Sequence, residues 1–158
     1  MKRVKQTSGA EAFEAYYAAL FGNRWPALRE ALLKETQPVA FSVRGGKPYY
    51  LDQASIYAAQ ALPPLDEGSY LDMCAAPGGK TLVLASGMGQ EAHIQANELS
   101  RSRRARLLTV LAEHLPPDIS TRIEVTGYDA ATLPRYRQAC CDRILLDAPC
   151  SSERHVIT

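Results

Sequence analysis

The stretch SYLDMCAAPGGKT, residues 69–81, predicts a strand, a tight turn and the start of a helix. Tyr70 and Leu71 begin a short apolar run, and Pro77 with the two glycines after it favours a sharp turn. The apolar residues 82–85 then suit the buried first turns of a helix. Such a turn aims backbone N–H groups and the positive end of a helix at a bound ligand. The glycines either let a ligand approach the backbone or only make a tight connection.

Downstream of this stretch, segments typical of strands alternate with a segment typical of a helix. The expected strands are residues 93–96, 121–126 and 143–146. The expected helix runs from Arg101 to Ala112, with Ser100 as its N-cap. This alternation predicts a doubly wound, Rossmann-like α/β fold, in which helices cover both faces of a mostly parallel sheet.

The N-terminal part of the chain predicts mainly helices. Residues 10–20 and 27–34 are rich in helix formers, and Asp52 is expected to cap a further helix. We therefore expect a helical N-terminal extension over residues 1–48 and one ligand-binding domain over residues 49–158.

Each of the four expected strands has an acidic residue at or near its carboxyl end. In a doubly wound sheet these ends form the ligand crevice, so four acids beside a glycine turn indicate a nucleoside site. Glu98 follows Asp72 by 26 positions, near the spacing at which a dinucleotide-type fold binds ribose hydroxyls. Alternatively, Glu98 stabilises the N-terminus of the helix behind it, and Asp129 is an ordinary turn residue. The four acids are Asp72, Glu98, Asp129 and Asp147.

Asp147 has the most constrained setting of these acids. It follows the apolar residues 144–146 and precedes Pro149, so a rigid backbone holds its carboxylate at the edge of the sheet. Cys150 beside it belongs to the site or is a buried small hydrophobe. The arginines between residues 101 and 106 favour a solvated helix face, and Arg103 is the one expected near the site.

The composition limits the class of protein. The 158 residues carry a net charge of +1, so a nucleic-acid partner would require a local basic patch. No apolar run has the length of a membrane span, and the N-terminus lacks the apolar stretch of a signal peptide. The four cysteines and three histidines fit no zinc-binding spacing. We therefore expect a cytoplasmic protein without a metal and without a membrane partner.

Two motifs carry a resemblance to a known family. CAAPGGKT at residues 74–81, together with DAPCS at residues 147–151, resembles the Sun-type family of S-adenosylmethionine-dependent RNA 5-methylcytosine methyltransferases. Residues 49–62 are similar to the element that precedes the cofactor loop in that family, and residues 21–33 resemble the extension of its rRNA-modifying members.

The resemblance implies a class I methyltransferase fold, S-adenosylmethionine as cofactor, and RNA, expected to be rRNA, as partner. The loop at residues 74–80 would wrap the methionine part of the cofactor, while Glu98 would bind its ribose and Asp129 its adenine. Asp147 would meet the target cytosine, with Lys80 orienting it or the base, and Cys150 would help to release the product. The implied cofactor-binding residues are Cys74, Ala75, Ala76, Pro77, Gly78, Gly79, Lys80, Glu98, Arg103, Asp129 and Asp147. The implied catalytic residues are Cys150, Asp147 and Lys80.

One part of the family pattern is missing from these 158 residues. C5 of cytosine becomes nucleophilic only when a thiolate adds at C6, and in the family this thiol comes from a later Thr-Cys motif. The sequence contains no Thr-Cys dipeptide, and only the first four core strands have counterparts. We therefore expect a fold that is incomplete on its C-terminal side and inactive alone, unless Cys150 supplies the thiolate. The exposed edge of the last strand would favour self-association.

Two other functions remain open at this point. Gly79, Lys80 and Thr81 match the end of the P-loop pattern of nucleotide hydrolases, but Cys74 stands where that pattern needs its first glycine. The chain could also be the non-catalytic half of a split methyltransferase that binds cofactor or RNA.

Overall fold

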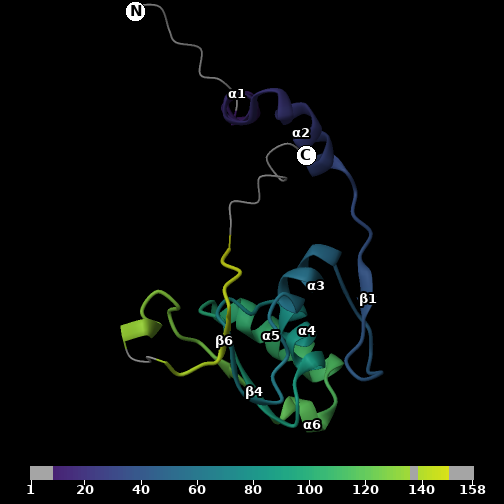
Figure 1. Ribbon diagram of the computed structural model, residues 1–158, viewed down its shortest axis with the longest axis vertical. Helices are drawn as coiled ribbons and strands as arrows, with labels where there is room; N and C mark the ends of the chain where they lie inside the picture. Colours follow the sequence, from purple (N-terminus) through teal and green to yellow (C-terminus); the bar gives the residue numbers. More distant parts are fainter. Residues whose placement is uncertain (1–8, 136–138, 150–158) are drawn as a thin grey trace, which may run out of the picture. The chain divides into compact units, whose positions relative to one another are not determined.

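The computed structural model describes residues 9–135 and 139–149 of the chain (Figure 1). These residues fall into two compact units, residues 9–36 and residues 37–149. Among the described helices, none is long and apolar enough to cross a membrane.

The first unit consists of α1 (Gly9–Phe21), the short 3-10 helix η1 (Gly22–Arg24) and α2 (Trp25–Leu33). Both helices expected from the sequence are confirmed. An aromatic cluster joins them, because the indole of Trp25 stacks on Tyr17 at 5.2 Å and on Phe21 at 6.3 Å between ring centroids. Nε1 of Trp25 also donates a hydrogen bond to Glu14 at 2.8 Å. This unit is therefore held together by α1 side chains that meet Trp25 at the start of α2.

The second unit begins with an antiparallel hairpin of β1 (Val39–Phe41) and β2 (Tyr49–Leu51), which leads into α3 (Gln53–Gln60). The domain boundary predicted after residue 48 falls within this hairpin, whereas the chain divides into the two compact units between Thr36 and Gln37. The division into domains stays a prediction.

The main sheet has four strands: β3 (Glu67–Asp72), β4 (Glu91–Asn97), β5 (Ile123–Thr126) and β6 (Arg143–Leu145). All neighbouring strands are parallel, in the order β5-β4-β3-β6. The strands alternate with α4 (Gly79–Gly87), α5 (Arg101–His114), α6 (Pro117–Ser120) and the 3-10 helix η2 (Leu133–Arg135). The order reverses at β3, as in a Rossmann-like sheet, so the predicted fold class is confirmed.

The strand expected at residues 121–126 is shorter than predicted. Its first two residues, 121 and 122, form a turn after α6, and the strand begins at Ile123. The reason is the pair of prolines before it, since Pro117 stands in the first turn of α6 and presets a helical φ angle.

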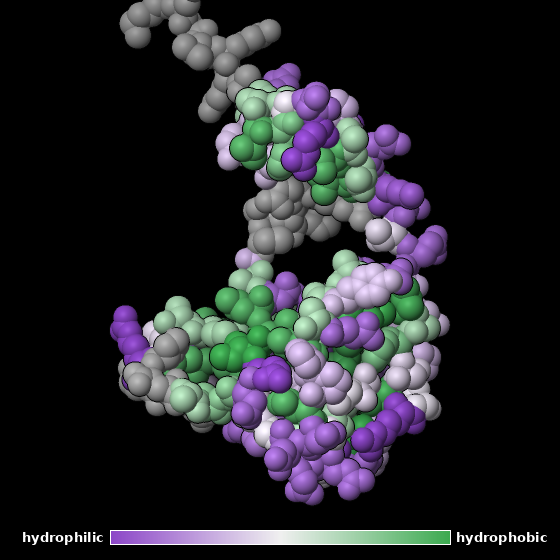
Figure 2. Space-filling view, viewed as in Figure 1, coloured by the Kyte–Doolittle hydropathy of each residue, from purple (hydrophilic) through white to green (hydrophobic). Residues whose placement is uncertain are grey.

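The two faces of the sheet differ in how they are covered. Ala92, Ile94 and Ala96 alternate along β4 and are buried in one apolar core with residues of α4 and α5. The connection between β5 and β6 lies over the opposite face, where Cys140 lines a cavity with His93. Among the described residues that connection holds only η2, and Ile144 of β6 stays 51% exposed. Figure 2 shows hydrophobic residues gathered in this region around β6 and hydrophilic residues at the end with α6.

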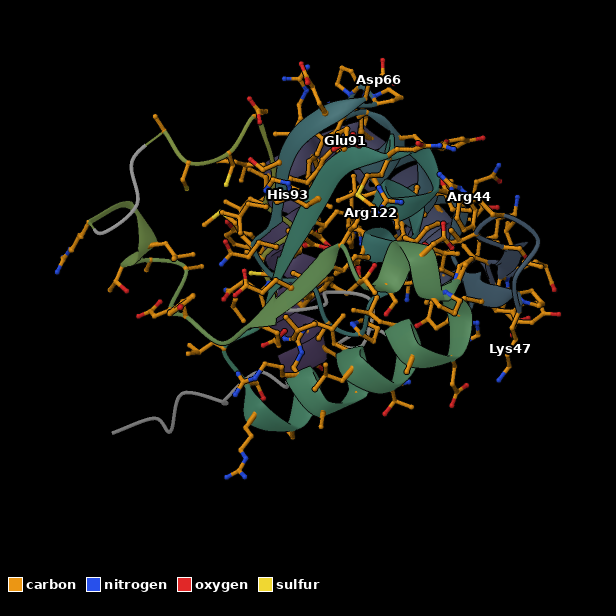
Figure 3. All side chains as sticks on the ribbon, turned by 90° about the horizontal axis from the view of Figure 1, so that it is seen from below. Arg44, Lys47, Asp66, Glu91, His93 and Arg122 are labelled. Carbon is orange, nitrogen blue, oxygen red and sulfur yellow. The ribbon has the colours of Figure 1, made fainter. Side chains whose placement is uncertain are left out.

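At the amino ends of the strands, charged groups are paired within the protein. The guanidinium of Arg122, labelled in Figure 3, donates hydrogen bonds to the backbone carbonyls of Gln90 and Ala92, both at 3.2 Å. Arg44 pairs with Asp118 at 3.2 Å and Lys47 pairs with Glu113 at 2.8 Å. These three cations therefore have partners within the protein, at the end of the sheet opposite to the strand-end acids.

Candidate functional site

The candidate site lies at the carboxyl ends of the parallel strands, where the expected acids gather. β3 ends at Asp72, and the turn that follows it, residues 73–78, leads directly into α4. The turn is tied to its surroundings at two points: the N–H of Ala75 donates to the carbonyl of Asn97 at 2.9 Å, and the carbonyl of Ala76 accepts from Arg103 at 3.0 Å. The loop therefore has a fixed shape before any ligand arrives.

Gly78 at the end of the turn and Gly79 at the start of α4 are required by packing inside the protein. Gly78 has φ +120°, and a Cβ atom there would meet Val110 at 3.0 Å and Leu107 at 3.2 Å. A Cβ atom at Gly79 would meet Tyr49 at 3.0 Å and Leu51 at 3.3 Å. Of the two explanations open at the sequence level, the tight connection accounts for both positions. α4 approaches α5 and β2 closely because neither glycine carries a side chain.

Asp72 is turned into the protein and does not join the other acids. It is 1% exposed, and its Oδ2 accepts a hydrogen bond from Oγ1 of Thr81 at 2.7 Å. Burial raises the pKa of the Asp72 carboxyl to about 6, although hydrogen bonds from Thr81 and the Cys74 backbone and the charge of Lys80 oppose this shift. Asp72 therefore fixes the loop to α4. The prediction that four strand-end acids surround one ligand is wrong for this residue.

Asp72 should make the stability of the chain depend on pH. Its pKa is higher in the folded than in the unfolded protein, so the unfolded state loses this proton first as the pH rises. The free energy of unfolding should fall by up to about 3 kcal/mol between pH 4 and pH 6 from this group. Urea denaturation across pH 3.5–7.5, on the wild type and on Asp72→Asn, measures the effect. Parallel curves for the two proteins would contradict the assignment.

Lys80 and Asp147 meet beside the loop. Nζ of Lys80 lies 2.7 Å from Oδ2 of Asp147 and donates to Oγ of Ser55 at 3.0 Å. These three side chains line a cavity of about 190 Å³, together with residues of the loop and with Tyr49, Leu51 and Asp52. The structure thus brings together the lysine and the aspartate that the two sequence motifs contribute.

Glu98 and Asp129 share a second cavity of about 450 Å³ on the other side of Cys74. Glu98 is 5% exposed, and its Oε1 accepts from the N–H of Ser100 at 2.9 Å. Its Oε2 lies 3.4 Å from Nε of Arg103. Oδ1 of Asp129 accepts from the N–H of Ala131 at 3.0 Å. Both acids therefore stabilise their own turns, and both also border a cavity at the strand ends.

Asn97 holds these strand ends together, a role that the sequence did not predict. Its Nδ2 donates to the carbonyls of Met73 and Tyr128 at 3.1 and 3.0 Å. Its Oδ1 accepts from Oγ1 of Thr126 and from the N–H of Tyr128 at 3.0 and 2.8 Å. One side chain, 1% exposed, thus links the ends of β3, β4 and β5. Its only sequence signal is an amide at the end of an apolar strand.

The thiols near the site are poorly suited to nucleophilic attack. Burial raises the pKa of the Cys74 thiol, and the negative charges of Glu98 and Asp72 raise it further. Cys140 lies in the connection before β6, with its Sγ 3.4 Å from that of Cys141. Cys150, the predicted catalytic cysteine, lies outside the described residues. In the part of the chain that the structure describes, no group of three or more His, Cys, Asp or Glu residues could hold a metal.

The sequence of this chain matches a known protein family. The sequence profile of the family described as 16S rRNA methyltransferase RsmB/F matches residues 59–157, which is more than half of the chain and includes the whole main sheet. The chain belongs to the RsmB/F family. The resemblance to Sun-type methyltransferases is therefore confirmed, and with it S-adenosylmethionine as the cofactor of the family.

Individual relatives agree with this membership. The RsmB/F member is 39% identical over 121 residues to the 5-cytosine rRNA methyltransferase NSUN4 of Bos taurus, covering 75% of this chain and 31% of that protein. It is 34% identical over 109 residues to the mitochondrial tRNA (cytosine(34)-C(5))-methyltransferase of Danio rerio, covering 68% of this chain and 29% of that protein. Its fold matches NSun6 from Pyrococcus horikoshii with SFG at a TM-score of 0.58 and 30% identity, over 66% of this chain and 26% of that one.

The RsmB/F member spans about a third of the length of the curated relatives named above. The matched family does not favour the P-loop explanation of Gly79, Lys80 and Thr81. In the structure Gly79 and Lys80 begin α4, and Thr81 bonds to the buried Asp72.

Proposed function

We propose that this chain forms the cofactor-binding part of a methyltransferase that acts on C5 of cytosine in rRNA. The observation that supports this best is the position of Cys74, which lines both cavities at the strand ends. A nucleoside-sized cavity with Glu98 and a smaller cavity with Lys80 and Asp147 thus meet at one loop, as transfer between two bound molecules requires.

The larger cavity has the chemistry to hold S-adenosylmethionine. Its apolar walls, which include Leu99, Ala130 and Pro149, suit a purine, while the buried carboxylate of Glu98 can accept hydrogen bonds from ribose hydroxyls. Asp129 lies on the same cavity and is proposed to meet the adenine edge. Arg103 would hold Glu98 and the loop in place. The cofactor, when bound, supplies a methyl group on a positively charged sulfur.

The smaller cavity is proposed to receive the cytosine. At about 190 Å³ it is below the usual range of pockets for drug-sized ligands, so it suits one small ring. The carboxylate of Asp147 would hydrogen-bond the polar edge of the base, and the ammonium of Lys80 would keep that carboxylate oriented. C5 of cytosine becomes nucleophilic only after a thiolate adds at C6. The thiol of Cys74, whose pKa is raised, is unsuited to this step. That thiolate would come from Cys150 or from a residue beyond this chain.

The substrate is tested in cells. Bisulfite sequencing of RNA from a strain that lacks the gene should lose 5-methylcytosine at one or a few rRNA positions, and an introduced copy should restore them. An unchanged rRNA pattern together with a lost tRNA site would show that the substrate is tRNA and not rRNA. This outcome is included because one relative is named for a tRNA. Loss of a DNA mark instead would remove the RNA assignment.

The activity of the chain itself is tested in vitro. With tritiated methyl donor and unmodified rRNA, we expect the 158-residue chain alone to bind cofactor without turnover, since none of its described thiols is placed as a nucleophile. Turnover that Cys150→Ala abolishes would show that the thiolate lies within this chain. The same preparation, analysed by sedimentation, tests the expected self-association through β6. The expected cytoplasmic location is part of the same proposal.

A further inference from the structure

Ser55 lies between two charged groups, and its hydrogen bonds have a defined direction. Nζ of Lys80 donates to Oγ of Ser55 at 3.0 Å, and Oγ of Ser55 donates to Oδ2 of Asp52 at 3.0 Å. An ammonium can only donate and an ionised carboxylate can only accept, so the hydroxyl must pass its hydrogen to Asp52 and turn a lone pair to Lys80. The carboxylate of Asp52 thereby polarises the Ser55 hydroxyl and makes its oxygen a stronger acceptor for the Lys80 ammonium.

The position of Ser55 is set by the start of α3. Asp52 is the N-cap of this helix, and the N–H of Ser55 donates to its backbone carbonyl at 3.1 Å. The Asp52 side chain and the Ser55 hydroxyl are therefore one turn apart on a rigid element. Lys80 stands in the first turn of α4, and α3 packs closely against α4. The contact between Ser55 and Lys80 thus joins two helices at the wall of the smaller cavity.

Lys80 needs a second contact to hold one orientation. Its side chain is long and loses much rotational freedom when it is fixed, and a single ion pair near solvent compensates for little of that loss. The side chain of Asp147 is 56% exposed, so its pair with Lys80 is of this kind, whereas the Lys80 side chain is only 21% exposed. Ser55 supplies the second contact from the less exposed side.

We propose that Ser55 is a positioning residue that holds the Lys80 ammonium against Asp147, with its hydroxyl polarised by Asp52. The meaning of this contact for catalysis rests on the proposed methyl transfer. The contact itself is a property of the folded chain and can be tested without cofactor or RNA.

The test measures how fast an acylating reagent modifies each lysine of the 158-residue chain, with mass spectrometry as the readout. Wild-type Lys80 should react at least fivefold more slowly than Lys47, whose side chain is 61% exposed. Ser55→Ala should raise the rate at Lys80 at least fivefold and leave Lys47 unchanged. Ser55→Thr keeps the hydroxyl and should return Lys80 to within twofold of the wild type.

The matched control is Ser86→Ala, which removes a hydroxyl from the helix of Lys80. Oγ of Ser86 donates to the carbonyl of Val83 at 2.7 Å within α4, so this variant should not change labelling at Lys80. Equal labelling of Lys80 in the wild type and Ser55→Ala would overturn the proposal. So would an equal rise in Ser55→Ala and Ser55→Thr, because a packing role does not depend on the hydroxyl.

The catalytic consequence has a separate readout. In a polypeptide that turns over, Ser55→Ala should lower kcat about tenfold with KM unchanged, and should cause no further loss in a Lys80→Met background. A further loss in that background would show that Ser55 does not act through Lys80. If the strain that lacks the gene keeps every 5-methylcytosine in its RNA while the labelling result holds, the proposed function fails and the positioning contact stands.

Discussion

Replacing Asn97 by aspartate should lower the free energy of unfolding by about 3–5 kcal/mol at pH 7.5. The two side chains have the same shape, but Nδ2 of Asn97 donates to the carbonyls of Met73 and Tyr128. A carboxylate oxygen in that place would face both carbonyl oxygens while buried, without a compensating cation. The loss should shrink at pH 5, because a protonated aspartate can donate to one of the carbonyls.

Urea denaturation at both pH values, compared with Asn23→Asp, separates this effect from charge alone. Asn23 is exposed in η1, so the same chemical change there should alter stability by less than about 0.5 kcal/mol. If Asn97→Asp were as stable as the wild type at pH 7.5, the three strand ends would not depend on this amide.

Replacing Glu98 by alanine should weaken the binding of S-adenosylmethionine at least a hundredfold. The reason is the proposed role of the Glu98 carboxylate as acceptor for two ribose hydroxyls, since each hydrogen bond to a charged group contributes about 1.5–3 kcal/mol. Burial strengthens the expected effect, because water cannot replace the lost acceptor at a side chain that is 5% exposed. Isothermal titration calorimetry on the 158-residue chain measures the dissociation constant directly.

The matched control is Glu91→Ala, at the opposite end of the same strand. Glu91 is exposed at the start of β4, so its loss should leave cofactor affinity within twofold of the wild type. Thermal unfolding of both variants checks that lost affinity does not follow from lost structure, because Glu98 also accepts a bond from Ser100. Unchanged affinity in Glu98→Ala would remove this residue from the site. Binding of ATP in preference to the methyl donor would instead favour the P-loop explanation of Gly79, Lys80 and Thr81.

The sequence predicted those parts of the molecule that depend on neighbours along the chain. Alternating apolar segments were sufficient for the four strands and for α5, whose N-cap Ser100 accepts from the N–H of Arg103 as expected. The resemblance to the Sun-type family implied that Lys80 orients Asp147 or the base, and the structure places Nζ of Lys80 2.7 Å from Oδ2 of Asp147. Where local pattern and topology agree, function-bearing residues could be located without coordinates.

The remaining features depend on partners far away in sequence. The closest approaches at Gly78 come from Leu107 and Val110, and only the packing of α4 on α5 makes them neighbours. Asn97 and Ser55 look like ordinary polar residues in sequence, and their hydrogen bonds reach Tyr128 and Lys80. Asp72 shares its sequence setting with the other strand-end acids and differs only in burial. Sequence patterns report the faces of elements, but not which side chains meet between them.

The strand order has a consequence for how the protein folds. β3 pairs with β4 across a short stretch of chain, as Tyr70 opposite Ile94 shows, whereas Ser69 and Asp142, which bond at the start of the β3–β6 pair, are 73 positions apart. Closing the longer loop costs about 1 kcal/mol more in chain entropy. The pairing of β6 with β3 can offset this cost only after β3 is in place. β6 should therefore dock last. Asp147 lies two residues after β6, so Lys80 gains this carboxylate partner only in the final step of assembly. A nascent chain would place Glu98 and Asp129 at the strand ends before the docking of β6 adds Asp147 to the smaller cavity and Pro149 to the larger one.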